Sequence, residues 1–233
     1  MSYIIDVYRG FIKPVRNYVL FCNYVIFFPQ LVAGPILRAG EMLWQLDKRP
    51  AFAWDDIVYG LNRIAAGLFL KVVLADNLAG FVNEAYAIDP SQLFAVDVLT
   101  LGFLFGFQIY FDFAGYSHIA IGVARLMGIR FPENFAFPYL SESPRVFWRR
   151  WHISLSSWIR DYVYLPMAGV KVADRMSTGG IGIDGTGQAG RNNAMFALFA
   201  TWAIMGLWHG AAWTFVLWGV WHATLVAGHR ILS

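Results

Sequence analysis

Charged residues are scarce in this sequence of 233 residues. Only 14% are Asp, Glu, Lys or Arg, whereas 58% are hydrophobic and 18% are aromatic. Soluble domains carry about 25% charged residues. Long apolar runs with so few charges are typical of proteins that live in membranes. The composition therefore predicts an all-α fold, a polytopic bundle of membrane-crossing helices.

Other absences narrow the function. Cys22 is the only cysteine, which excludes a disulfide framework and a cysteine-based metal site. The net charge is +3 and the basic residues are scattered, so we expect no nucleic-acid partner. The sequence holds no GxSxG elbow, no HExxH motif and no Walker loop. The first run, MSYIIDVYRGFIKP, lacks the features of a signal peptide and reads like the end of a helix whose beginning is missing.

Several apolar runs are candidates for membrane-crossing helices, which need about 20 residues each. They are Tyr18–Val32, Ile57–Val82, Leu93–Phe113, Ala194–Trp208 and Ala212–Ile231. A separate, shorter helix is expected in YSHIAIGVARLMGIRF. Charged residues inside such runs usually face a bundle interior or a wet cavity. Asp112 is one of them, whereas Lys71 and Asp97 suit the alternative of a charge that snorkels to a helix end.

The run SPRVFWRRWHISLSSWIRDYVYLP, residues Ser143–Pro166, predicts one uninterrupted amphipathic helix. A serine can cap its start, one proline suits its first turn and another stops it. At helical spacing the aromatic and aliphatic residues form a stripe. Arg149, Arg150 and His152 lie on the polar side. A basic amphipathic helix with Trp and Tyr lies in the membrane interface or re-enters to line a polar cavity.

The run STGGIGIDGTGQAGRNN, residues Ser177–Asn193, contains Gly180, Gly182 and Gly185 in a formal GxGxxG pattern. A dinucleotide site would also need a strand before the motif and a helix after it in a βαβ unit. No such unit is visible. We therefore expect a flexible loop between membrane elements.

Two histidines interrupt the apolar run AIMGLWHGAAWTFVLWGVWH. On an uninterrupted helix, His209 and His222 would lie about 20 Å apart along the axis, so they approach each other only if the chain breaks near Gly210. His209 follows Trp208, and we expect its imidazole to be buried and neutral, as a general base requires. Structural packing is the alternative. Two histidines alone are weak evidence for a metal site, and we expect none.

Three stretches together carry a resemblance to a known family. They are FFPQLVAGPILRAGEM, the long run from QIYFDFAGYSH to RDYVYLP, and MGLWHGAAWTFVLWGVWHA. They closely resemble the membrane-bound O-acyltransferases, nearest to the bacterial alginate O-acetyltransferase branch. The resemblance implies one domain of this type over residues 1–233, incomplete at both ends. It also implies a many-helix bundle around a funnel that narrows within the membrane.

The resemblance assigns roles to both histidines of the paired motifs RWH and WHG. His209 matches the catalytic histidine of the family, and His152 matches a second functional position. The implied reaction moves an acyl group, expected to be acetyl, toward hydroxyls of an exported polysaccharide. His209 would accept the hydroxyl proton, and His152 would bind or orient a substrate.

The resemblance also implies the surroundings of the reaction. The donor is an acyl thioester, such as acetyl-CoA or an acyl carrier, and no cofactor is tightly bound. Arg149 and Arg150 would attract that anionic donor, although a solvated or headgroup-facing role is the alternative. Trp208 and Asp112 complete the expected substrate-binding set. The expected partners are membrane lipid and a polysaccharide or periplasmic acyl-accepting protein, at the bacterial inner membrane with several crossings.

Two rival functions stay open at this point. The chain is either an enzyme or an inactive, truncated membrane scaffold that binds partner subunits. A proton-coupled transporter would use Asp97 and Asp112 with the histidines as a relay. Transporters often contain internal repeats, and no convincing repeat links the two halves of this sequence.

Overall fold

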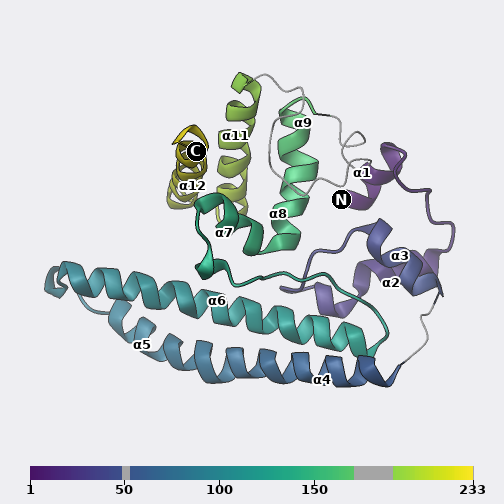
Figure 1. Ribbon diagram of the computed structural model, residues 1–233, viewed down its shortest axis with the longest axis horizontal. Coiled ribbons are helices and arrows are strands. Elements are labelled where there is room, and N and C mark those ends of the chain that lie inside the picture. Colours follow the sequence, from purple (N-terminus) through teal and green to yellow (C-terminus); the bar gives the residue numbers. More distant parts are fainter. Residues whose placement is uncertain (49–52, 171–190, 233) are drawn as a thin grey trace. The chain divides into compact units, whose positions relative to one another are not determined.

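The computed structural model describes residues 1–48, 53–170 and 191–232. The described residues form helices and irregular segments without a strand, which confirms the all-α prediction (Figure 1). They divide into two compact units. The first unit comprises residues 1–13 and 135–233, and the second unit comprises residues 14–134. The single domain expected over the whole chain stays a prediction. The glycine pattern at residues 180–185 lies outside the described residues.

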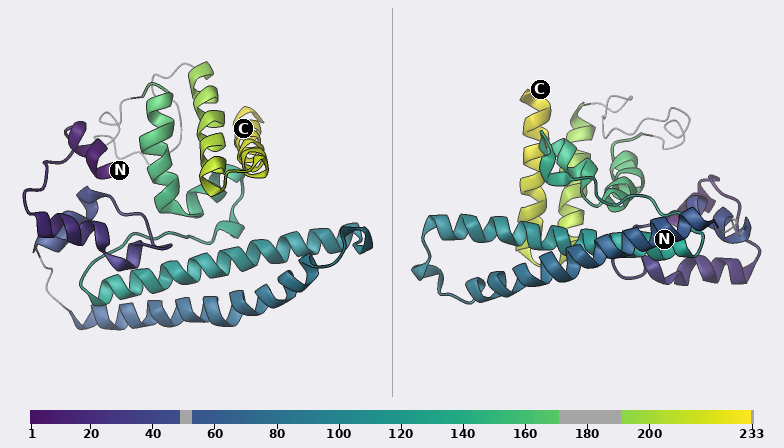
Figure 2. Two further views of the ribbon diagram at one scale, coloured as in Figure 1. Left: turned by 180° about the vertical axis from the view of Figure 1, so that it is seen from behind. Right: turned by 60° about the horizontal axis from the view of Figure 1, so that its bottom comes forward.

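The second unit is built around a long helical hairpin. Its helices are α2 (Tyr18–Ile26), α3 (Ala39–Lys48), α4 (Trp54–Leu68), α5 (Asp76–Tyr86) and α6 (Ala95–Leu126), with short 3-10 turns at Phe28–Gln30 and Pro90–Gln92. A π-helical segment, Phe69–Ala75, joins α4 to α5 without a break. In both views of Figure 2 this continuous rod runs alongside α6.

The hairpin supplies the described helices that suit a membrane by length and composition. Trp54–Tyr86 has 33 residues and Ala95–Leu126 has 32, and both are long and apolar enough to cross. These two helices confirm the helical runs predicted at Ile57–Val82 and Leu93–Phe113. At about 1.5 Å per residue each is about 50 Å long, more than the roughly 30 Å hydrocarbon core of a bilayer.

Two predicted element boundaries in this unit are wrong. The run that begins YSHIAIG is not a separate helix, because α6 continues through Gly115 to Leu126. Gly115 does not break α6. Because it has no side chain, the backbone of α6 can touch that of α4 at this point. The predicted span Tyr18–Val32 ends as an α-helix at Ile26, and Pro29 lies in the 3-10 turn that follows. Nine α-helical residues are too few to cross a bilayer.

Paired glycines let α4 and α6 touch backbone to backbone. A Cβ atom built on Gly67 would lie 2.6 Å from the carbonyl oxygen of Gly115, and one on Gly115 would lie 2.8 Å from that of Gly67. Gly60 and Gly122 face each other in the same way, with 2.9 and 2.6 Å. Small residues at such positions are the usual device for close helix packing in membranes.

Lys71 forms two ion pairs inside the hairpin. Lys71 Nζ lies 2.7 Å from an oxygen of Asp76 and 2.7 Å from an oxygen of Asp112. Snorkelling is therefore the wrong interpretation of Lys71, which lies midway along the rod and forms ion pairs there. Asp97 does lie at a helix end. It is in the first turn of α6, where its carboxylate accepts a hydrogen bond from Phe94 N–H at 2.9 Å.

The first unit contains the predicted amphipathic run and the two C-terminal helices. Its helices are α1 (Ser2–Tyr8), α7 (Pro144–Arg150), α8 (Ile153–Ile159), α9 (Leu165–Met167), α11 (Arg191–His209) and α12 (Trp213–Leu232), with a 3-10 turn at Pro138–Leu140 and a π-helical segment at Arg160–Tyr164. The runs predicted at Ala194–Trp208 and Ala212–Ile231 are thus helical, and their crossing of a membrane stays a prediction.

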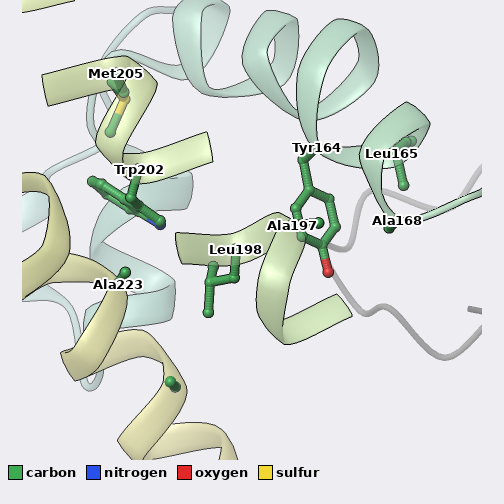
Figure 3. Close-up of a cluster of buried hydrophobic side chains, with 9 residues drawn as sticks. Tyr164, Leu165, Ala168, Ala197, Leu198, Trp202, Met205 and Ala223 are labelled. Atoms are coloured by element: carbon green, nitrogen blue, oxygen red, sulfur yellow. The ribbon is translucent and has the colours of Figure 1, made fainter. Parts of the chain in front are cut away.

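A single apolar core holds this unit together (Figure 3). Tyr164 and Leu165 approach from the end of the amphipathic run, Leu198 and Trp202 from α11, and Ala223 from α12. Alanine on α12 leaves room for the large side chains of α11. The core therefore fixes the C-terminal hairpin against the amphipathic run.

Replacing Gly115 with alanine tests the glycine contact in the second unit. Because the added methyl group meets the backbone of α4, we expect Gly115→Ala to lower the free energy of unfolding by about 1–3 kcal/mol. Gly102, in the same helix, has nothing within 4 Å of a built Cβ and is the matched control. Gly102→Ala should be neutral or stabilising by up to about 1 kcal/mol. Thermal unfolding in detergent measures both, and equal midpoints would contradict the contact.

Candidate functional site

The amphipathic run breaks at the histidine that the sequence singles out. Ser143 caps α7, because its Oγ accepts a hydrogen bond from Val146 N–H at 3.2 Å. The helix then ends at Arg150, and His152 has φ +42° and ψ +57°, in the left-handed region. The prediction of one uninterrupted helix to Pro166 is therefore wrong, and its continuous apolar stripe does not exist.

Aromatic packing accompanies the break. Trp151 stacks on Phe147 with ring centroids 5.6 Å apart and meets Phe135 edge to face at 5.2 Å. The left-handed turn at the next residue brings the ring of His152 parallel to that of Phe135, at 6.4 Å. Only Phe137 shares this backbone conformation among the described non-glycine residues. A side chain in this region is uncommon, and such positions cluster at functional sites.

His152 is buried and neutral. Its side chain is 7% exposed, and Nδ1 lies 3.5 Å from the hydroxyl of Ser154. Burial is the main cause that lowers the pKa of His152 to about 4, and the nearby His209 contributes a smaller effect in the same direction. The polar, cavity-lining position expected of His152 is thus replaced by an enclosed one.

His209 is exposed, which corrects the expectation of a buried imidazole. It is the last residue of α11, and its neighbour Trp208 is 62% exposed. The His209 ring meets Trp208 edge to face at 5.0 Å and Trp218 at 5.3 Å. The helix ends here because the chain turns at Gly210, and the last three residues of α11, Leu207 to His209, are all exposed.

The C-terminal hairpin is closed by the turn after His209. Ala212 N–H donates to Gly210 O at 2.8 Å, and Phe215 N–H donates to Ala212 O at 3.1 Å. The helices pack closely because a Cβ on Gly206 would collide with the carbonyl oxygen of Phe215. Gly219 faces the carbonyl of Trp202 in the same manner. The break near Gly210, on which any approach of the two histidines depended, is therefore present.

Three tryptophan rings surround His222, and we call the four residues Trp148, Trp202, Trp218 and His222 the tryptophan cluster. The His222 ring lies 4.9 Å from Trp148, 5.7 Å from Trp202 and 4.8 Å from Trp218. Trp218 is the member that also touches His209. The sequence marked His222 only as a possible partner of His209, and the intervening tryptophan was not foreseen.

The predicted arginines have different environments. Arg150 Nη1 donates to Leu140 O at 3.1 Å, and its own carbonyl accepts from Ala136 N–H at 3.0 Å. Arg150 thus fastens the segment before α7. Arg149 is partly buried on the same helix. Both lie in the first unit with His152, His209 and Trp208, whereas Asp112 belongs to the second unit.

Sequence reasoning missed an anchor of the first helix. Tyr162 OH donates to the carboxylate of Asp6, 2.7 Å from each oxygen, and Arg9 lies over the Tyr162 ring at 5.8 Å. Asp6 is only 6% exposed. A lone aspartate in an apolar terminal run was the available signal, since a buried carboxylate needs a partner. No group of three or more metal-ligating side chains occurs in the described part of the chain.

Comparisons with known proteins point to the same family that the motifs resemble. A family model described as the membrane-bound O-acyltransferase family matches residues 15–181, a range that includes His152 and ends before His209. The chain is 42% identical over 233 residues to a protein of Azotobacter vinelandii named "Probable alginate O-acetylase". That match covers 100% of this chain and 42% of the other.

Two further relatives carry different names. A "Peptidoglycan O-acetyltransferase" of Helicobacter pylori is 38% identical over 221 residues, covering 94% of this chain and 38% of its own. A "Teichoic acid D-alanyltransferase" of Bacillus subtilis is 32% identical over 242 residues, covering 99% of this chain and 56% of its own. This chain therefore spans between 38% and 56% of the length of these relatives.

Acid should destabilise the fold through His152. Because the folded pKa lies near 4 and the ordinary value is 6.5, the unfolded chain binds the proton first as the pH falls. The free energy of unfolding should then decrease between pH 6.5 and 4, by at most about 1.4 kcal/mol per pH unit. The thermal midpoint of His152→Asn should fall less than that of the wild type over this range. Identical falls would show that His152 is not enclosed.

Proposed function

The chain belongs to the membrane-bound O-acyltransferase family, and from this premise we propose that it moves an acyl group onto hydroxyls of an exported polysaccharide. The group is acetyl, by analogy with the alginate and peptidoglycan relatives, whose names specify O-acetyl transfer. His209 is the general base. The D-alanyl relative differs in the acyl group it carries, so the shared chemistry is acyl transfer to a polymer.

The observation that carries this proposal is the pairing of an exposed and a buried histidine in one unit. His209 stands at the end of α11, where an acceptor hydroxyl can reach its imidazole. His152 is enclosed, and its burial keeps it neutral. A merely structural pair of histidines would have no reason to combine solvent access at one ring with backbone strain at the other.

The reaction needs one proton acceptor. The hydroxyl oxygen attacks the acyl carbonyl of the donor while His209 takes its proton, and the thiol of the donor leaves. General-base assistance of this kind is worth about 10²–10⁴ in rate. His152 binds a substrate or orients the reacting groups. No metal is needed for this step, and the proton supplied to the leaving thiolate can be the one that His209 accepted.

The remaining groups bind substrates. Arg149 and Trp208 lie in the same unit as the two histidines, and we assign them to the donor, an anionic thioester such as acetyl-CoA or an acyl carrier. Arg150 contributes through its contact with Leu140 O, which shapes the segment before α7. Asp112 is paired with Lys71, so its part in substrate binding requires that pair to open or to act as a unit.

The protein acts at a membrane. The family is membrane-bound, and two described helices are able to cross. We place it in the bacterial inner membrane with several crossings, where a donor and an exported polysaccharide or a periplasmic acyl-accepting protein can both be reached.

Acetyl content of cell-surface polysaccharide tests the proposal. Mild alkali releases ester-linked acetyl from polysaccharide of cells that carry the chain, its His209→Ala variant, its His229→Ala variant or no chain. We expect acetyl with the wild type and a loss of about 100-fold or more with His209→Ala. His229, on the same hairpin, is the matched control and should retain full transfer.

Two results would contradict the proposal. Equal amounts of released acetyl from wild-type and His209→Ala cells would show that His209 is not the general base. No acetyl above background in wild-type cells that accumulate the protein would favour a scaffold without activity.

A further inference from the structure

Trp218 stands between the proposed base and the rest of the first unit. Its ring meets His209 at 5.3 Å, His222 at 4.8 Å, Trp148 at 5.8 Å and Trp202 at 6.1 Å. These partners come from three different helices, α7, α11 and α12. Trp218 is thus the ring that connects the exposed histidine to the buried core.

His209 has few other constraints among the described residues. Its ring contacts there are with Trp208, its exposed neighbour in sequence, and with Trp218, and no hydrogen bond to its imidazole is present in that part of the chain. General-base histidines are ordinarily oriented by a hydrogen bond to the second ring nitrogen. In this part of the chain the edge-to-face contact with Trp218 is the restraint that can orient the imidazole.

The hairpin geometry explains why Trp218 reaches His209. Side chains on a helix lean toward its N-terminus. His209 on α11 therefore leans back from the turn, whereas Trp218 on α12 leans toward the turn, so the two side chains converge. The contacts of Gly206 and Gly219 with the opposite backbone bring the helices close enough for the rings to touch.

Trp218 is itself held in place. Trp202 is 8% exposed and belongs to the apolar core, and its ring meets those of Trp148 and Trp218. Rotation of Trp218 would have to displace these rings. A base on an otherwise exposed helix end gains a fixed direction from such a neighbour, and misplacement by about 1 Å can cost about 100-fold in rate.

From these contacts we infer that Trp218 is the positioning residue of the site, orienting the His209 imidazole by edge-to-face contact. The inference deepens the proposed function and rests on the role of His209 as base. The three parts of the site then have different roles. His209 reacts, Trp218 sets its direction, and the tryptophan cluster fixes Trp218.

Steady-state kinetics in membranes that carry the chain separate positioning from binding. The probe is radiolabelled acetyl-CoA, with label counted in the polysaccharide fraction. We expect Trp218→Leu to lower kcat by about 10- to 100-fold, with the KM for acetyl-CoA changed by less than about 2-fold. Trp218→Phe keeps an aromatic edge and should stay within about 3-fold of the wild-type kcat.

The matched control is Trp221→Leu. Trp221 lies on the same helix but is 61% exposed, so its loss should leave kcat within about 2-fold of the wild type. Should Trp218→Leu fail to accumulate, Trp218→Met replaces it, because the flexible thioether fills the gap without supplying a ring.

A second measurement reads the contact without relying on transfer. Diethylpyrocarbonate modifies accessible imidazoles, and mass spectrometry counts the product at each histidine. Trp218→Leu should raise the modification rate of His209 several-fold and leave that of His229 unchanged, whereas Trp218→Phe should change neither.

The outcomes are distinguishable. An active wild type with an inactive His209→Ala variant and an unaffected Trp218→Leu variant would overturn the positioning role alone. Loss of kcat in Trp218→Phe equal to that in Trp218→Leu would also overturn it, because a ring edge would not suffice. Full transfer by His209→Ala would overturn the proposed function and the positioning role together, whatever the modification rates.

Discussion

Backbone-to-backbone contact at glycine is the constraint on which both units depend. In the second unit the pairs Gly60–Gly122 and Gly67–Gly115 let two long rods touch, and in the first unit Gly206 and Gly219 do the same for the C-terminal hairpin. Helices in lipid gain little from hydrophobic burial against one another, so close packing carries much of their association. A methyl group at these positions would push the helices apart, and the ring contacts around His209 need them close.

The close hairpin accounts for the histidines in an apolar run. His222 is enclosed by tryptophans, and His209 stands at the end of α11 where the packed interface stops. The two are linked through Trp218, which touches both. The two histidines of this run therefore have different roles. His222 packs among aromatic rings, and His209 is exposed to a substrate.

Sequence patterns predicted the helices better than the positions where helices end or break. Apolar runs located the hairpin rods and the C-terminal helices, and Gly210 marked the position where the chain turns between the last two. The break at His152 was not predicted, because no glycine or proline marks it and the packing of Trp151 on rings distant in sequence accompanies it. His209 was predicted to be buried and is exposed, and His152 was predicted on a polar helix face and is enclosed. Burial depends on where a helix ends relative to its neighbours, and periodicity does not report that.

The same limits apply to the candidate site. Motif resemblance selected His152 and His209, and the structure groups both with Arg149, Arg150 and Trp208 in one unit. Asp112 belongs to the other unit, where it pairs with Lys71, and its part in the site stays a prediction. Trp218 and the anchor formed by Asp6 with Tyr162 were missed, because ring contacts and hydrogen bonds between distant positions leave no periodic signal.

Chemical rescue tests most directly whether His209 acts as the base. His209→Gly removes the imidazole at an exposed helix end, so imidazole added to the membranes can enter the vacated position. The account predicts that free imidazole restores measurable acetyl transfer to the His209→Gly variant in proportion to its concentration, and that it does not stimulate the wild type. Transfer by His209→Gly at the wild-type rate without imidazole, or no rescue in a variant that folds and still binds acetyl-CoA, would contradict it.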